Sequence, residues 1–265
     1  MKLLNIDQNA KTVKGQKVGF MTAILYLAPY KLSGVNICPM AEIAGCWKAC
    51  LNVQGRGGIS KGSKKMRRNG ITLPDNAIQR CRIKRTRMWT ESKGAFLDQL
   101  EKEITAFIKK AKRKGLTPVV RLNGTSDIQW ERIRHNFCGN YGVLDQTIFE
   151  RFADIQFYDY TKIAKRFKRE LPSNYHLCLS YSDANEKYAL SCWEAHGQHG
   201  ASLVMVYRTK DDIAQARNWY QECGVNFVDG DANDLRFLDP AKSIVALKAK
   251  GTAKRDKSGF VLDFK

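Results

Sequence analysis

Three cysteines near the N-terminus are the residues whose type and spacing point most directly to chemistry. Cys38, Cys46 and Cys50 lie within 13 residues, with the spacing C-x7-C-x3-C. Cys46 and Cys50 are four residues apart, so one helical turn would place both thiols on the same face. The loop from Cys38 to Gly45 could then fold back to present the third thiol. Thiolates are soft ligands that suit zinc or an iron–sulfur cluster, so the pattern predicts a metal site.

The spacing leaves the identity of the metal open. A structural zinc site has four protein ligands, and the four histidines of the chain all lie far away in sequence. A fourth zinc ligand would therefore have to be Cys81 or a residue beyond it. A cluster held by three cysteines needs no fourth protein ligand and leaves one iron open to a small molecule. A third reading is that the cysteines are small buried apolar residues without metal. We expect a four-iron four-sulfur cluster, with zinc as the alternative metal.

Polar residues also recur where apolar runs end. The stretches RLNGTSD, FYDYTK, SYSD, DGDANDLR and LKAK each begin at or follow such a run. Active sites of parallel α/β proteins lie at the carboxyl edge of the sheet, where the loops converge, although Asn, Asp, Ser and Gly also favour ordinary turns. Because the pattern occurs at five predicted strand ends, we expect a site there. The residues expected to act on a substrate are Asp159, Lys162, Asp183, Asp231 and Asp234.

The charge of the chain favours polyanionic partners. The net charge is +19, from 45 Lys and Arg against 26 Asp and Glu. The stretch from Arg56 to Arg87 holds eleven basic residues against the single acid Asp75, a local charge of +10. We expect this stretch to bind phosphate groups of DNA or RNA without reading the sequence, with a solvated charged loop as the alternative. The residues expected to bind nucleic acid are Arg56, Lys61, Lys64, Lys65, Arg67, Arg68, Arg82, Lys84, Arg85 and Arg87.

Clustered carboxylates suggest a competing chemistry. Asp229, Asp231 and Asp234 lie close together in sequence, and such groups can hold Mg²⁺ and position a water against a phosphodiester. Together with the aspartates at the other strand ends, they make a metal-dependent nuclease a further hypothesis. The same stretch also suits a plain turn.

Alternating apolar runs and amphipathic stretches would position these residues. The pattern predicts strands at residues 19–28, 85–89, 117–122, 155–158, 176–181, 202–207, 226–229 and 244–247. Helical periodicity covers residues 96–114 and recurs at 145–152, 162–169 and 211–223. Strands and helices in alternation are typical of a parallel α/β sheet. We therefore predict an α/β fold, a (β/α)8-type or partial barrel of mostly parallel strands, although an open doubly wound sheet fits the same pattern.

The chain as a whole, residues 1–265, is expected to form a single domain with a basic insertion-like segment at about residues 51–87. This length can bury a large core without disulfides. The sequence contains no apolar run of the roughly 18 residues that a membrane helix needs, and its N-terminus is not a secretory signal. Scattered cysteines fit a reducing compartment. We expect a cytoplasmic protein that does not bind membranes.

A predicted strand followed at once by a three-cysteine loop resembles the radical S-adenosylmethionine (SAM) enzymes. The resemblance implies that Cys38, Cys46 and Cys50 hold a four-iron four-sulfur cluster in the first loop of a (β/α) barrel, that the open iron binds SAM, and that an external electron donor is needed. The usual spacing of that family is C-x3-C-x2-C, and only Glu91 stands in for its Gly-Gly-Glu motif. The residues expected to hold SAM are Glu91, Asn123, Ser126 and Asp127.

Nearly the whole chain is similar to the gene-88-type family of bacteriophage proteins. The stretches that carry the similarity are residues 25–50, 121–127, 157–162, 180–185, 229–240 and 247–251. The resemblance implies a phage origin, and therefore the host cytoplasm, and one continuous domain, but it brings no activity. The leading hypothesis is an iron–sulfur, radical-SAM-like enzyme that acts on nucleic acid or a nucleotide. The alternative is a non-catalytic nucleic-acid-binding accessory protein with a structural zinc site.

Overall fold

A large, mostly parallel sheet forms the centre of the protein. The computed structural model describes residues 1–6, 10–53, 55–59, 66–68, 71–73, 76–139 and 142–264. Within them the strand order is β1-β2-β5-β8-β9-β10-β12-β11, and β13 pairs with the end of β10. The strands are β1 (Leu4–Ile6), β2 (Phe20–Leu25), β5 (Thr117–Arg121), β8 (Gln156–Thr161), β9 (Tyr175–Ser180), β10 (Ser202–Tyr207), β11 (Phe227–Asp229), β12 (Ile244–Lys248) and β13 (Val261–Leu262).

The order of the strands brings their carboxyl ends to one edge. β1 is antiparallel to β2, and the other described pairs of this sheet are parallel. β2, β5, β8, β9 and β10 lie side by side in chain order. In such a sheet the loops that follow the strands gather at the same edge, where α/β proteins place their sites.

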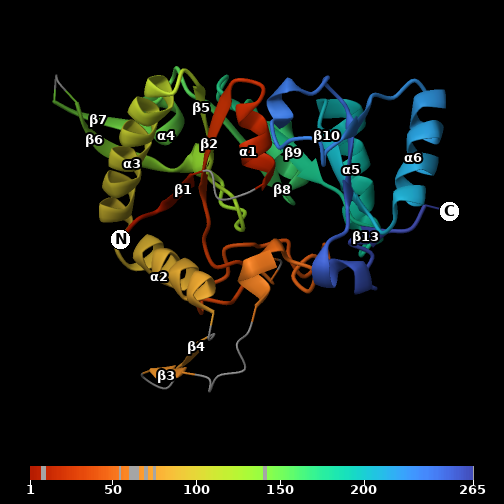
Figure 1. The fold of residues 1–265 in the computed structure, drawn as a ribbon, viewed down its shortest axis with the longest axis horizontal. Coiled ribbons are helices and arrows are strands. Elements are labelled where there is room, and N and C mark those ends of the chain that lie inside the picture. The colour runs from red at the N-terminus through yellow and green to blue at the C-terminus, as the bar shows by residue number, and fades with distance from the viewer. Residues whose placement is uncertain are drawn as a thin grey trace.

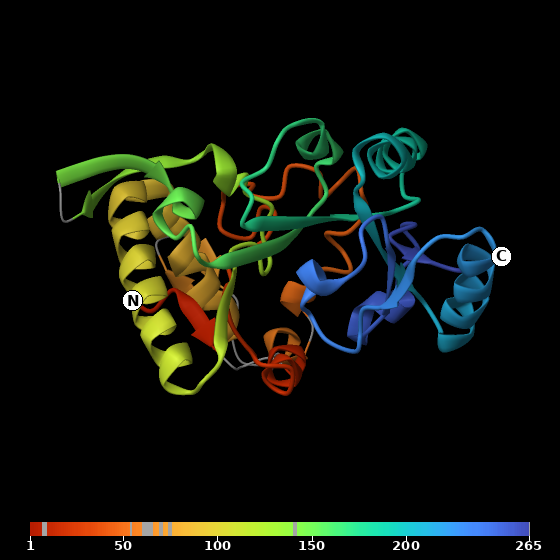
Figure 2. The ribbon, with the colours of Figure 1, turned by 90° about the horizontal axis from the view of Figure 1, so that it is seen from above.

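The described helices pack around the sheet (Figure 2). They are α1 (Ala10–Gln16), α2 (Ala77–Glu91), α3 (Lys93–Arg113), α4 (Ile148–Arg151), α5 (Glu186–His199) and α6 (Lys210–Glu222). Figure 2 shows α3, α4, α5 and α6 along the outside of the curved sheet, with α1 on the opposite side. One core forms where Phe96, Leu100 and Ile104 of α3 meet Val120 of β5, and a second where Cys192 of α5 meets the far strands.

The other face of the sheet is buried as well, as the period of two along a strand requires. Val120 belongs to the core under α3, whereas its neighbour Val119 packs with Tyr158 and Leu235 on the opposite face. Leu235 belongs to the segment between β11 and β12, so that segment covers the face opposite α3. Burial on both faces explains why the central strands appear in the sequence as continuous apolar runs.

The sheet is open, and the closed form of the predicted barrel is wrong. In the part of the chain that the structure describes, the strands at its two ends, β1 and β11, each pair with one neighbour and not with each other. What the prediction has right is a single α/β domain with a mostly parallel sheet. The strand at the second edge is β11, which follows α6 in the chain and pairs with the outer side of β12.

Strands occupy seven of the eight predicted positions, and the run at residues 85–89 is helical instead. It lies in the middle of α2, which begins where the Asn76 side chain accepts hydrogen bonds from the N–H groups of Ile78 and Gln79. α2 buries Ile83 and Thr86 one turn apart, a periodicity that the short window missed.

Of the predicted helices, two are confirmed in full. α3 covers the stretch at 96–114 and α6 the stretch at 211–223. The stretch at 145–152 is helical only in the single turn of α4, and the stretch at 162–169 forms a 3-10 helix at residues 164–168. The helix α5 and the strand β1 were not predicted.

Two hairpins lie outside the main sheet. β3 (Met66–Arg68) pairs with β4 (Ile71–Leu73), and β6 (Arg134–Gly139) pairs with β7 (Gly142–Thr147). The first falls in the segment predicted to be insertion-like, and Figure 1 shows it below the main body of the protein. None of the described helices has both the length and the hydrophobicity to cross a membrane.

Candidate metal centre

The loop that carries the three cysteines (the cysteine loop, residues 26–50) crosses the carboxyl edge of the sheet. All of its residues are described, and they form turns and bends without a helix or strand. The loops after β5 and β9 hold its backbone: Thr125 Oγ1 donates to Leu27 O at 2.6 Å, and Ser182 Oγ donates to Ala44 O at 2.8 Å. Figure 1 shows the loop running along the lower side of the sheet. It therefore lies where the carboxyl ends of β2, β5 and β9 meet.

Gly45 fixes the middle of the cysteine loop. Its φ of +64° lies in the left-handed region, and a Cβ there would stand 2.7 Å from Ser258 Oγ and 2.9 Å from the Cβ of Ala184. Ser258 Oγ also donates to Gly45 O at 3.1 Å. The residue before Cys46 is thus held against the C-terminal segment of the chain.

The three thiols are partly buried, unpaired by disulfides and within range of one another's charges. Burial is the largest cause that raises the pKa of each thiol, that of Cys50 to about 11. The charges of Cys46 and Cys50 raise the pKa of Cys38 further, and the charge of Cys46 raises that of Cys50. Without a metal the thiols are therefore protonated near neutral pH, and a bound metal would displace their protons.

Each of the three thiols makes a hydrogen bond at a distance that is ordinary for sulfur. Cys38 and Cys46 each donate to a backbone carbonyl at 3.8 Å, and Cys50 accepts from the N–H of Asn52 at 3.5 Å. In the described part of the chain no three His, Cys, Asp or Glu side chains stand close enough together to hold one ion. The three thiols therefore do not form a metal site in the described structure, and they would have to move closer together to bind an ion.

Lys162 places a cation beside Cys46. It follows β8, is only 9% exposed, and donates from Nζ to Ser180 O at 2.9 Å and to Tyr181 O at 3.2 Å. Burial lowers the pKa of Lys162 to about 8, and the charge of Cys46 opposes this shift. In return, the ammonium group lowers the pKa of the Cys46 thiol. This residue, predicted to act on a substrate, is held inside the fold by two backbone carbonyls, and only its charge acts on the cysteine loop.

Arg82 places a second cation beside Cys50. Its charge lowers the pKa of the Cys50 thiol, and its NH1 group donates to Asn52 Oδ1 at 2.6 Å. Neither Arg82 nor Ser182 was predicted to contact the cysteine loop. Ser182 lies in the stretch SYSD after a predicted strand, which was a usable signal. Arg82 comes from α2, and nothing in the local sequence indicates its partner.

Two of the residues predicted to hold SAM, Asn123 and Ser126, are already used inside the fold. The side-chain oxygen of Asn123, Oδ1, accepts hydrogen bonds from Ser126 Oγ at 2.9 Å, from the N–H of Ile128 at 2.9 Å and from Trp130 Nε1 at 3.2 Å. Its amide nitrogen donates to Ile128 O at 2.9 Å and to Asp159 Oδ2 at 3.3 Å. These contacts fix the turn after β5 and leave little capacity for a ligand.

The other two predicted SAM residues lie apart from each other. Asp127 is buried and accepts from Thr161 Oγ1 and from the N–H of Lys162, each at 2.7 Å. It therefore joins the loop after β5 to the end of β8. Glu91 is exposed at the last residue of α2 and does not follow a strand, because the strand predicted before it is helical.

Two of the aspartates predicted to act on a substrate are buried in hydrogen-bonded contacts. Asp159 is 1% exposed, accepts from the N–H of Asn123 at 2.7 Å and from the Tyr175 hydroxyl at 3.1 Å, and burial raises its pKa to about 7. Asp234 is 5% exposed and accepts from Arg121 NH1 at 2.9 Å. Both carboxylates stabilise the packing of the sheet with its covering segments.

The remaining two aspartates are more accessible. Asp231 pairs with Lys11 and Lys250, and the hydrogen bonds from Lys250 and from the N–H of Lys248 hold its pKa below the usual value although burial opposes them. Asp183 is exposed at the carboxyl end of β9 and accepts from the Tyr181 hydroxyl. The described aspartates do not gather into a metal-holding group of three.

The predicted nucleic-acid residues divide into buried and exposed ones. Arg82 and Arg85 are each 9% exposed, and Arg85 Nε donates to Lys2 O at 2.9 Å. Arg56 and Lys84 are exposed, and Arg87 is partly exposed. Cys81, the candidate fourth zinc ligand, is exposed on α2, whereas the three other thiols are partly buried. Outside the described residues, either entirely or in their side chains, lie Lys61, Lys64, Lys65, Arg67 and Arg68.

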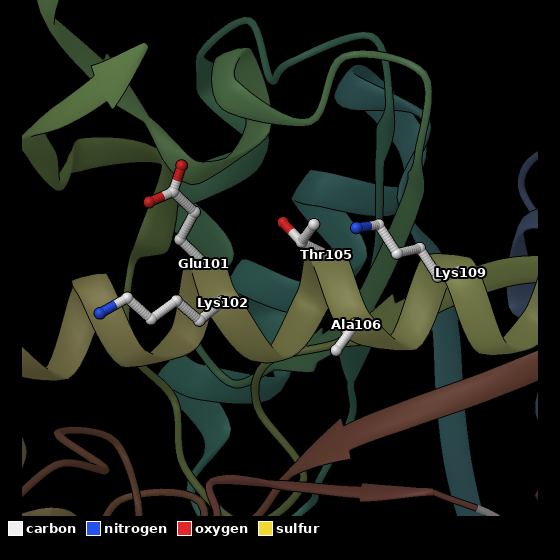
Figure 3. Close-up of a pocket in the computed structure, with 5 residues that line it drawn as sticks. All are labelled: Glu101, Lys102, Thr105, Ala106 and Lys109. Carbon is white, nitrogen blue, oxygen red and sulfur yellow. The ribbon is translucent and has the colours of Figure 1, made fainter.

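A shallow hollow on α3 does not belong to the site. It is lined by Glu101, Lys102, Thr105, Ala106 and Lys109. All five lie on one helix, as Figure 3 shows, so they do not converge on a ligand from several elements as the residues of a binding site do.

The fold and the loop define an α/β protein with an open, mostly parallel sheet whose carboxyl edge is crossed by a loop that carries three cysteines. The chain belongs to the gene product 88 family, whose model matches residues 2–263. This match confirms the similarity of the stretches between residues 25 and 251. No curated protein and no solved structure matches the chain, and nothing in these comparisons matches the radical SAM enzymes.

Proposed function

We propose that the protein binds an iron–sulfur cluster through Cys38, Cys46 and Cys50 and acts as a radical-SAM-like enzyme on nucleic acid or a nucleotide. One observation carries the proposal: three partly buried thiols, within range of one another's charges, lie on the loop that follows the first of the parallel strands. The four parallel strands that follow the first one lie beside it in chain order. The radical SAM enzymes also carry their cluster on the loop after the first strand, and this common position supports the proposal.

The donor set fits such a cluster in its chemistry. Three thiolates carry a charge that a buried loop must compensate, and the described structure provides Lys162 beside Cys46 and Arg82 beside Cys50. The described thiols do not stand close enough together to hold one ion, so binding of the cluster would have to draw the sulfur atoms together. Such a cluster would supply an iron open to SAM, fed by an external electron donor.

The residues that would contact SAM differ from those predicted. Asn123 and Ser126 are committed to the turn after β5, and Glu91 lies at the end of a helix. Asp183 is the predicted acid that is exposed at the carboxyl end of a strand, and we assign it the contact with a cationic group of the ligand.

Metal content after anaerobic purification and reconstitution tests the proposal. We expect brown protein with iron and sulfide, and colourless protein from each of Cys38→Ala, Cys46→Ala and Cys50→Ala. Cys81→Ala is the matched control, because this thiol is exposed on α2 and its loss should leave the colour unchanged. SAM should bind the reconstituted protein and not the metal-free protein.

Two results would overturn the proposal. Wild-type protein that stays colourless after reconstitution and carries stoichiometric zinc would support a nucleic-acid-binding accessory protein instead. A colour that survives in all three cysteine variants would place the cluster elsewhere in the chain.

A further inference from the structure

An aromatic pair lies at the surface of the cysteine loop. The ring centroids of Tyr30 and Trp47 are 5.8 Å apart with an interplanar angle of 30°, and Trp47 is 44% exposed. Tyr30 has a φ of +49°, a conformation that residues other than glycine rarely adopt and that often marks a functional position. The partly exposed ring of Tyr30 thus lies against the exposed ring of Trp47, the residue after Cys46.

A lysine accompanies each ring. Lys31 Nζ lies 5.0 Å from the Tyr30 centroid, and Lys48 Nζ lies 5.2 Å from the Trp47 centroid. Around them the same part of the chain exposes further apolar side chains, a concentration that is typical of binding surfaces. These side chains are Leu32, Val35, Ile43, Leu51 and Ile59.

We propose that this aromatic–lysine platform (Tyr30, Lys31, Trp47 and Lys48) binds single-stranded nucleic acid. Every base offers a flat face that stacks on an aromatic ring, and its phosphate lies close enough to pair with a neighbouring cation. In a duplex the bases stack on one another, so exposed rings favour a single strand. The net charge of +19 adds general attraction to a polyanion.

This inference deepens the proposed function, because it names the substrate that would reach the cysteine loop. The platform is next to Cys46 in the chain, so a base stacked on Trp47 would lie at the entrance to the candidate metal centre. The binding step itself needs no metal, which allows the two proposals to be tested apart.

Glu42 offers an internal check on the charge of the platform. It accepts a hydrogen bond from the Tyr30 hydroxyl, and it pairs with Lys31 Nζ at 3.1 Å. A carboxylate at this position repels phosphate and competes for the lysine. Glu42→Gln should therefore strengthen the binding of a single strand.

Fluorescence anisotropy with labelled oligothymidylate, an RNA of equal length and a DNA duplex tests the inference over a range of salt concentrations. We expect the single strands to bind more tightly than the duplex. Trp47→Ala should weaken single-strand binding by about fivefold or more and leave its salt dependence unchanged. Lys31→Ala and Lys48→Ala should each reduce the slope of log K against log salt by about 0.7.

Two variants serve as controls. Trp219→Ala removes a tryptophan of α6 that is 57% exposed and should leave binding unchanged. Trp47→Phe keeps a ring on the platform and should restore most of the affinity, which separates stacking from a fault in folding.

Tighter binding of the duplex, or equal losses in Trp47→Ala and Trp219→Ala, would overturn the inference. Metal content is measured on the same samples. If Trp47→Ala keeps its metal but loses strand binding, the cluster proposal is still supported. If the wild type is colourless but still binds the single strand, the cluster proposal fails and the inference about the platform is still supported.

Discussion

Two polar regions of the molecule, a network of hydrogen-bonded side chains and the cysteine loop, differ in how many hydrogen bonds their polar groups make inside the fold. In the polar network (Asn123, Asp127, Asp159, Arg166 and Tyr175), each side chain hydrogen-bonds with others inside the fold. In the cysteine loop, the hydrogen bonds of the thiols are 3.5–3.8 Å long, and the nearby aromatic ring of Trp47 is exposed. The network is satisfied within the fold, whereas the loop is proposed to bind a ligand.

The difference shows that the position of a polar residue at a strand end does not by itself make a site. Asp159 within β8 and Lys162 just after it both find partners inside the fold, Asp159 with the N–H of Asn123 and the Tyr175 hydroxyl, and Lys162 with two backbone carbonyls. A buried polar group must be satisfied, and one that is satisfied within the fold has little left for a ligand. Mutations in each region test whether the two regions differ in their effects on stability and on ligand binding.

The largest effect is expected from Arg166→Ala in the polar network. Arg166 is 2% exposed, donates to Glu131 from Nε at 2.9 Å and from NH2 at 2.6 Å, and lies 3.5 Å from Asp127. Its removal leaves buried carboxylates without their cation, which costs about 3–5 kcal/mol of the free energy of unfolding. Urea denaturation followed by circular dichroism measures the loss.

Arg134→Ala is the matched control for this prediction. Arg134 also pairs with two carboxylates, Asp145 and Glu150, but its side chain is 50% exposed. Solvent screens such a pair, so the change in unfolding free energy should be much smaller. Equal losses in the two variants would show that burial does not distinguish the network from the surface.

A smaller effect with a characteristic pH dependence is expected from Asp159→Asn. Asp159 accepts from the N–H of Asn123 and from the Tyr175 hydroxyl, so an amide nitrogen would face a donor. The resulting cost is about 1–3 kcal/mol at pH 5, measured by urea unfolding.

The sign of the pH dependence follows from burial, which raises the pKa of Asp159 in the folded protein to about 7, above its usual value of about 3.9 in an unfolded chain. Between these values the folded protein binds more protons, so its stability falls as the pH rises. The amide introduced by Asp159→Asn does not titrate, so the cost of the substitution should shrink between pH 5 and pH 8. A cost that stays constant over this interval would mean that the carboxylate is already ionised at pH 5, with the charge of Arg121 outweighing burial.

Much of the fold could be predicted from the sequence, because the central strands are buried on both faces. The runs at residues 117–122 and 202–207 are apolar at nearly every position, and both are strands. The run at residues 85–89 was misassigned because its helix depends on the cap at Asn76, nine residues earlier, and on burial of Ile83 and Thr86. Closure of the sheet depends on its two end strands, about which a local pattern says nothing.

The site could be predicted only in its residue types. The cysteine spacing identified a loop, and the structure places that loop at the carboxyl edge of the sheet. The commitment of Asn123 to the fold could not be predicted, since its partners Trp130 and Asp159 come from separate parts of the chain. The sequence shows which groups are polar, and the fold decides which of them remain available.

The smallest effect on stability is expected from Cys46→Ala in the metal-free protein. Its thiol makes one hydrogen bond at 3.8 Å, and losing an apolar group of this size costs about 1 kcal/mol, close to the value for one buried methylene. The same substitution should abolish cluster binding on reconstitution. The cysteine loop is thus expected to show the opposite behaviour to the polar network, with a small effect on unfolding and a complete effect on metal content.

Urea denaturation of the metal-free wild type and variant, paired with iron and sulfide analysis of the reconstituted samples, measures both effects. A loss of stability as large as that of Arg166→Ala would place Cys46 among the residues that build the fold. The contrast between the regions would then disappear, because a thiol that the packing requires has the same role as Asn123 or Asp127. A small loss together with colourless protein would instead separate the two regions by function, since only a ligand makes the thiol necessary.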